Sequence, residues 1–170
     1  MTGVATARGY APRRGAWVPP HNLPSVAHLQ VLSRRAASIF ACITDTVVAP
    51  EPVLPPVRET DAVAFFDDWM RRLPRVNRAA MRALLWAAEL TPRFTGFGAR
   101  LRRLDRTRRH EWLRGVERGP IAQTRMIVKL LVSAAQLAYY GDDAVMLRLG
   151  YDADANKRRG DELRAAEGRP

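Results

Sequence analysis

Apolar residues recur at every third or fourth position over much of the chain after residue 28, a spacing that predicts amphipathic helices. The first apolar stripe predicts a helix that ends before the prolines of residues 50–56, because consecutive prolines remove backbone donors and disfavour the helical conformation before them. A second helix follows, and Thr60 is its expected N-cap. The stripes consist of Leu29, Leu32, Ala36, Ile39, Ile43 and Val47 in the first helix, and of Val63, Phe66, Met70 and Leu73 in the second.

Two further helices are expected before residue 119. The third runs from about Arg75 to Leu90 and is stopped at Pro92, since proline breaks a helix interior. The fourth comes in two pieces, one over residues 99–103 and one over residues 105–118 that begins at Asp105. The third helix is expected to turn four residues toward the core, namely Val76, Ala80, Leu84 and Ala87.

The fifth predicted helix runs from Ile121 to about Tyr140 and is apolar around most of its circumference. We therefore expect it to be the central helix, covered on most sides by the others. Gly141 is its expected C-cap, and Asp142 is expected to cap a short helix that Gly150 closes. The fold class predicted is all-α, a single bundle of about five helices with a central apolar helix and flexible N- and C-terminal tails. The polar residues of the fifth helix form one narrow stripe of Arg125, Lys129, Ser133 and Gln136.

The chain divides into three expected segments. Residues 1–25 contain glycines and prolines without periodicity, which indicates a disordered or extended arm anchored at most by Trp17 and Val18. Residues 26–152 are expected to form the helical domain. Residues 153–170 are a mixed-charge tail whose one large apolar residue is Leu163, and we expect this tail to fray.

Composition agrees with one globular domain, because 47% of the 170 residues are hydrophobic and 26% are charged. A single cysteine, Cys42, excludes an intramolecular disulfide and a cysteine-rich metal cluster. No uncharged apolar stretch reaches the roughly 18 residues of a membrane span, and the N-terminal residues lack the pattern of a secretory signal. These features favour a cytoplasmic protein.

Charge is concentrated in one segment. The chain has 28 basic and 17 acidic residues, a net charge of +11, and residues 93–118 alone hold nine arginines against three acidic residues. This segment predicts a basic surface that is solvated or faces a protein partner. Nucleic acid is the second interpretation, although only Phe94, Phe97 and Trp112 could stack on bases there, and an anionic membrane surface is the third.

Candidate catalytic residues do not converge in the sequence. His21, His28 and His110 have no metal-ligand spacing, so no metal site is expected. Cys42 lies near Ile39 and Ile43 of the first helix and is expected to be a small buried side chain. Two pairs of adjacent carboxylates, Asp67-Asp68 and Asp142-Asp143, point about 100° apart on a helix, so capping and solvation explain them better than acid–base chemistry.

Several segments resemble the small helical subunit family typified by gluconate 2-dehydrogenase subunit 3. Residues 45–50 (DTVVAP) look like that family's "DTIIP" exit from the first helix, and residues 63–67 (VAFFD) like its "V..F.D" second helix. Residues 97–113 look like its "F..LS...R...L" segment. The most specific likeness is the end, where Lys129, residues 138–142 (AYYGD) and residues 149–152 (LGYD) are similar to "K.L...AYYGDP....LGYD" of actinobacterial members.

The resemblance implies a non-catalytic small subunit or dedicated chaperone. Such proteins accompany a large flavin-dependent oxidoreductase of the glucose-methanol-choline type, so FAD is expected on the partner and no cofactor on this chain. Aromatic residues at helix ends commonly dock partners, and the alternative for the tyrosines is that they cap the core. The residues expected to bind the partner are Tyr139, Tyr140, Gly141, Tyr151, Trp17 and Trp112. A basic helical nucleic-acid-binding protein is the alternative function.

Overall fold

The computed structural model describes residues 29–48 and 53–167. The regular secondary structure of this part of the chain is helical, with no strand, which confirms the predicted all-α fold class. Two single turns of 3-10 helix, η2 (Val57–Glu59) and η3 (Leu101–Arg103), lie between the longer elements. The α-helices are α1 (Arg34–Val48), α2 (Ala62–Arg72), α3 (Arg75–Phe94), α4 (Arg106–Glu117), α5 (Ala122–Tyr140), α6 (Asp143–Arg148) and α7 (Ala153–Ala166).

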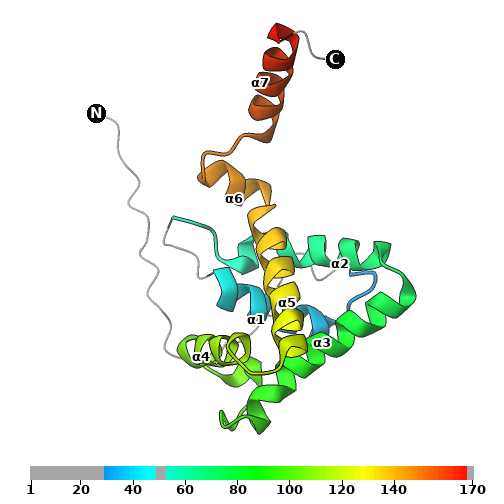
Figure 1. Ribbon diagram of the computed structural model, residues 1–170, viewed down its shortest axis with the longest axis vertical. Helices are drawn as coiled ribbons and strands as arrows, with labels where there is room; N and C mark the ends of the chain where they lie inside the picture. The colour runs from blue at the N-terminus through cyan, green and yellow to red at the C-terminus, as the bar shows by residue number, and fades with distance from the viewer. Residues whose placement is uncertain (1–28, 49–52, 168–170) are drawn as a thin grey trace.

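The most deeply buried element is α1. All nine residues from Ala36 to Thr44 are buried, because α2, α3, α4 and α5 pack around this helix (Figure 1). Phe40 stacks on Phe66 of α2 with 3.7 Å between the ring centroids, and both rings are fully enclosed. The central apolar helix of the bundle is therefore α1.

The expected burial of α5 on most sides is wrong. One side of α5 packs on α1, α2 and α4, while the opposite side is open to solvent and bears large apolar residues. Periodicity shows how apolar a helix is, but α5 has apolar residues on both sides and the bundle covers only one of them. Its buried residues are Val128, Leu131, Ala135, Ala138 and Tyr139.

Three predicted boundaries shift for identifiable reasons. α1 begins at Arg34, not Leu29, because Asp67 binds the backbone N–H groups of residues 30–32 and holds them outside the helix. Thr60 does not cap α2: its hydroxyl donates to the carbonyl of Val57, and Asp61 occupies the N-cap position. Pro92 lies inside the last turn of α3, which ends at Phe94, near the helix end where few backbone bonds are lost.

The inward face of α3 is displaced by one position from the expected one. Met81, Leu85 and Ala88 are buried, whereas Val76 is 78% exposed. The expected face and the observed face of α3 both contain small and apolar residues at helical spacing. Packing against α1 determines that the observed face is the buried one.

Other predicted helix ends are confirmed. Asp105 caps α4 by accepting the N–H of Arg108, and Asp142 caps α6 by accepting those of Ala144 and Val145. Gly150 follows α6 with φ of 74°, a left-handed conformation that glycine adopts without strain.

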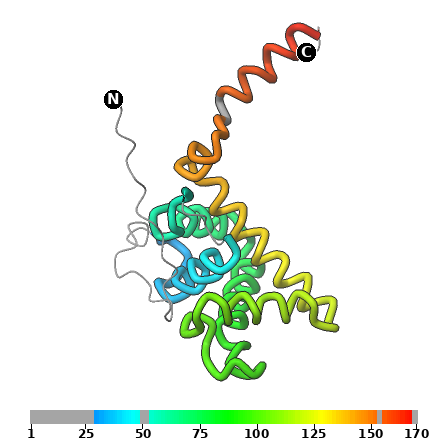
Figure 2. Tube along the Cα trace, turned by 90° about the vertical axis from the view of Figure 1, so that its left-hand side faces the viewer, coloured from blue at the N-terminus to red at the C-terminus, as the bar shows by residue number. Residues whose placement is uncertain are grey.

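Residues 153–166 form the helix α7, in the segment that the sequence analysis expected to fray. Asp152 caps this helix by accepting the N–H of Ala155. α7 projects away from the body (Figures 1 and 2). Its residues from 155 onward are exposed, apart from the half-buried Gly160. Within the described residues, no helix is both long and apolar enough to cross a bilayer.

Candidate partner-binding surface

The tyrosine pair at the end of α5 splits between the core and the surface. Tyr139 is fully buried, and its hydroxyl donates to the carbonyl of Pro55 over 2.6 Å. Burial, with smaller contributions from Tyr140 and Asp142, raises the pKa of Tyr139 to about 12. Tyr140 packs edge-on against the Tyr139 ring but keeps 41% of its surface exposed. The core-capping alternative therefore describes Tyr139, and only Tyr140 is available to a partner.

Trp112 also belongs to the core. It is 5% exposed in α4, and its indole N–H has no hydrogen-bond partner in the described chain. Trp112 and Tyr139 were expected to bind a partner, but both are buried in the described chain and cannot contact one. Trp17 lies outside the described residues.

The remaining predicted residues lie close in sequence, at the surface around α6. Gly141, Tyr140 and Tyr151 are exposed there, and so are two leucines that the sequence analysis did not select, Leu147 and Leu149. Their exposure could have been suspected from the short length of α6, which has room to bury only Val145. We call the exposed residues Tyr140, Leu147, Leu149 and Tyr151 the C-terminal patch.

Backbone bonds hold the segment of the C-terminal patch in a defined shape. The N–H groups of Leu149 and Tyr151 donate to the carbonyls of Val145 and Met146 over 3.0 and 2.9 Å. At the other end of α6, a Cβ atom on Gly141 would lie 2.7 Å from the carbonyl oxygen of Leu137. No other residue fits this turn without a shift of the backbone, so Gly141 shapes the patch through its small size.

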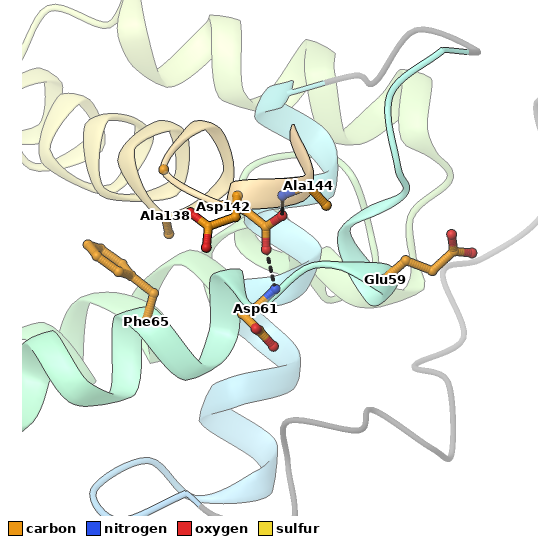
Figure 3. A pocket seen from close by; sticks show the side chains of 8 residues that line it. Glu59, Asp61, Phe65, Ala138, Asp142 and Ala144 are labelled. Atoms are coloured by element: carbon orange, nitrogen blue, oxygen red, sulfur yellow. Dashed lines mark hydrogen bonds between the residues drawn. The ribbon is translucent and has the colours of Figure 1, made fainter. Parts of the chain in front are cut away.

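Next to the patch lies an open pocket of about 350 Å³ between the start of α2 and the junction of α5 with α6 (Figure 3). The Asp142 side chain lines this pocket, and one of its carboxylate oxygens accepts the backbone N–H of Asp61 over 2.7 Å. That bond ties α2 to the α5–α6 junction. The lining contains four carboxylates, Glu59, Asp61, Asp142 and Asp143, together with the partly exposed ring of Phe65.

The sequence analysis expected capping and solvation for the carboxylate pairs Asp67-Asp68 and Asp142-Asp143, and the structure adds an anchoring role for Asp67. Asp142 caps α6, and Asp68 binds Arg71 and Arg72, which lower the pKa of its carboxyl group. Asp67 is different, because it is buried and holds three backbone N–H groups. Among the described residues, no group of three or more histidine, cysteine or carboxylate side chains is arranged to hold a metal ion.

Several arginines of the basic segment 93–118 turn inward. Arg102 pairs with the buried carboxylate of Glu89 over 3.1 Å, and Arg109 pairs with Asp45 over 3.0 Å. Arg106 donates to the backbone carbonyl of Asp45. These guanidinium groups tie the segment to α1 and α3, which reduces the positive charge that the segment offers to an anionic partner.

His110 lies half-buried in α4 beside this cluster. Burial, followed by the positive charges of Arg106, Arg114 and Arg109, lowers its pKa. Burial, aided by the neighbouring arginines, therefore favours the neutral imidazole. His21 and His28 lie outside the described residues.

Cys42 is fully buried in α1, as expected, where its sulfur lies 2.8 Å from an Arg109 nitrogen. Burial raises the pKa of the thiol to about 11, although Arg109 acts in the opposite direction. At pH 8 the thiolate fraction is therefore about 100-fold lower than for an exposed cysteine. We expect a disulfide reagent such as Ellman's reagent to label the native chain at least that much more slowly than the urea-unfolded chain. Equal labelling rates would contradict the burial of Cys42.

Comparisons with known proteins found no matching family model, no matching curated protein and no matching solved structure.

Proposed function

We propose that this chain is a non-catalytic helical subunit that binds and stabilises a flavin-dependent oxidoreductase of the glucose-methanol-choline type. The observation that carries the proposal is the C-terminal patch, where residues of the AYYGD and LGYD motifs, Tyr140, Leu149 and Tyr151, are exposed. These motifs carry the most specific part of the resemblance to the small-subunit family. FAD would reside on the partner, and this chain would supply contact surface.

The chemistry of the patch suits protein docking. Tyrosine and leucine side chains bury a large area for few rotatable bonds, and tyrosine keeps a hydroxyl that can bond at the rim of an interface. The backbone bonds around α6 fix the segment that carries them, which reduces the entropy lost on binding. The acidic pocket beside the patch gives a cationic side chain of the partner a complementary place to dock.

The proposal is tested by retention of a flavoprotein. Full-length tagged chain, expressed in its source organism, is expected to retain a large protein with visible flavin absorbance in a fixed molar ratio. Combining Leu149→Glu with Tyr151→Ala should reduce this retention at least about 10-fold, because both changes lie in the patch. Phe94→Ala is the control, since Phe94 is also an exposed apolar residue but lies at the C-terminal end of α3, outside the patch.

Two results would contradict the proposal. One is the absence of any flavin-containing partner under conditions in which the tagged chain is folded. The other is a flavoprotein whose retention is unchanged by the patch variant. Steeply salt-dependent retention of DNA or RNA in place of a flavoprotein would support the alternative function. That alternative has less support, because Arg102 and Arg109 are engaged in internal ion pairs.

A further inference from the structure

A row of arginines runs along α3 and is joined by one arginine of α1. Arg75, Arg82 and Arg93 are separated by about two and about three helical turns, so they lie on one line of α3 over about 27 Å. The guanidinium carbon of Arg35 lies 5.2 Å from the centre of the Trp86 ring, which belongs to the same line. We call Arg35, Arg75, Arg78, Arg82 and Arg93 the α3 arginine row.

The α3 arginine row is open to solvent beside the start of α1. Four of its arginines are exposed, and Arg78 is half-buried. One guanidinium nitrogen of Arg82 donates to the backbone carbonyl of Val31 over 2.6 Å. This carbonyl is uncharged, so the contact orients the side chain and leaves its positive charge in place. Figure 1 shows α3 along the lower right edge of the body, and the start of α1 packs beside it.

Among the described residues, no carboxylate forms an ion pair with the row. The acidic residues within α1 and α3 are Asp45 and Glu89, and both pair with arginines outside the row. Asp67 of α2 lies nearby, because it binds the N–H of Val31, but it is buried and holds three backbone N–H groups. The sequence before residue 29 contains no acidic residue. The five arginines therefore attract an anion from outside the described chain.

The side chains beside the row indicate which kind of anion fits. Large apolar side chains of α3 are exposed only at the two ends of the helix, at Val76 and Phe94. A lipid surface and a protein interface both depend on large apolar side chains that become buried on contact. A nucleic-acid backbone requires cations at close range, and small side chains permit that approach. Between the two ends, the solvent side of α3 carries four exposed alanines, Ala79, Ala80, Ala83 and Ala87.

The same surface favours a duplex over a single strand. Single strands are held largely by bases that stack on exposed aromatic rings. Trp86, the aromatic residue within the row, is half-buried and lies under the guanidinium group of Arg35. A duplex presents a rigid line of phosphates, and guanidinium groups bind phosphate oxygens through paired hydrogen bonds.

From the charge, the length and the small side chains of this surface we infer that the α3 arginine row binds the phosphate backbone of a nucleic-acid duplex. Contacts to phosphates carry no sequence information, so the binding is independent of sequence and strongly dependent on salt. The surface differs from the basic segment 93–118, of which only Arg93 belongs to the row. The inference does not depend on the flavoprotein, and it uses no residue of the C-terminal patch.

Binding of duplexes of random sequence to the purified full-length chain tests the inference. Fluorescence anisotropy of labelled DNA and RNA duplexes of about 20 base pairs gives the association constant between about 50 and 200 mM salt. This constant is expected to fall about 100-fold or more over that range, because each phosphate contact releases counterions. Binding of either duplex through the row supports the inference, and the comparison of DNA with RNA identifies the source of the phosphates.

A double variant locates the binding on the row. Combining Arg75→Gln with Arg93→Gln should weaken duplex binding about 10-fold and reduce the slope of log K against log salt concentration by about 2. Both side chains are exposed, so the variant should keep its fold, which circular dichroism checks. Combining Lys157→Gln with Arg159→Gln is the matched control. It removes the same charge from two exposed positions of α7, and it should leave the affinity and the slope unchanged.

Several results would overturn the inference. They are the absence of binding to either duplex, and equal losses in the row variant and the α7 variant. Polyglutamate that competes as well as the duplex at equal charge would show that the row does not select phosphate. Phosphatidylserine vesicles bound through the row without duplex binding would assign it to a lipid surface. If the chain binds no duplex but retains a flavoprotein, the proposed function stands. Duplex binding through the row without any flavoprotein contradicts the proposed function alone.

Discussion

Replacing Asp67 with alanine is expected to reduce the free energy of unfolding by about 3–4 kcal/mol. Asp67 is 4% exposed, and its two oxygens accept the backbone N–H groups of Gln30, Val31 and Leu32 over 2.7 to 3.1 Å. Alanine would leave these donors without their acceptor beside the core. The segment that leads into α1 would then lose its attachment to α2. Urea unfolding followed by circular dichroism measures the change.

Asp68 provides the matched control for this prediction. It is the adjacent residue of α2, and among the described residues it binds Arg71 and Arg72 at the surface. Asp68→Ala should leave the unfolding midpoint nearly unchanged, because exposed ion pairs contribute little. The unfolding midpoint of Asp67→Asn should fall between those of Asp67→Ala and Asp68→Ala. The amide oxygen of asparagine can still accept a hydrogen bond, whereas its amide nitrogen cannot. Equal midpoints for the Asp67→Ala and Asp68→Ala variants would show that the anchor does not stabilise the fold.

The helix ends that the sequence predicted correctly are those set by local chemistry. Asp105 and Asp142 cap helices whose first N–H groups lie two or three residues further on, and Gly150 adopts a left-handed turn. Such contacts can be inferred from a few adjacent residues. The start of α1 could not be inferred this way, because Asp67 lies 35 to 37 residues from the backbone groups that it binds.

The errors in the core have a related cause. Periodicity identifies apolar faces, but it does not say which face other helices cover. α1 and α5 are both strongly apolar, and only the tertiary arrangement makes α1 the central helix. The register of α3 was ambiguous for the same reason, since Leu84 and Leu85 are adjacent and only Leu85 is buried.

The partner-binding residues were predicted in part. Tyr139 and Tyr140 are consecutive on a helix and therefore point about 100° apart, so they could not both lie against the core. Amino-acid type does not decide which of them is buried. The inward arginines were also hidden from the sequence, because Arg102 and Arg109 find their partners, Glu89 and Asp45, on other helices.

Breaking the ion pair between Arg109 and Asp45 by removing one partner is expected to be among the most destabilising single changes. Arg109 is 3% exposed, and it binds Asp45 on α1 over 3.0 Å. Arg109→Met should lower the free energy of unfolding by about 3–5 kcal/mol, because it removes the partner of a largely buried carboxylate. Arg93→Ala, an exposed arginine of the same segment, should change it by no more than about 0.5 kcal/mol.

A double variant separates the attraction of the pair from the cost of burying its charges. Combining Arg109→Met with Asp45→Leu removes both charges and leaves apolar groups of similar size, so most of the lost stability should return. The same variants address the alternative function. If Arg109 contributed to a nucleic-acid surface, Arg109→Met would reduce the salt dependence of nucleic-acid retention at unchanged stability. Arg109 is buried where α4 packs on α1, so Arg109→Met is expected to lower stability and not to alter a nucleic-acid surface. Any nucleic-acid retention should therefore decrease only in proportion to the folded fraction of the protein.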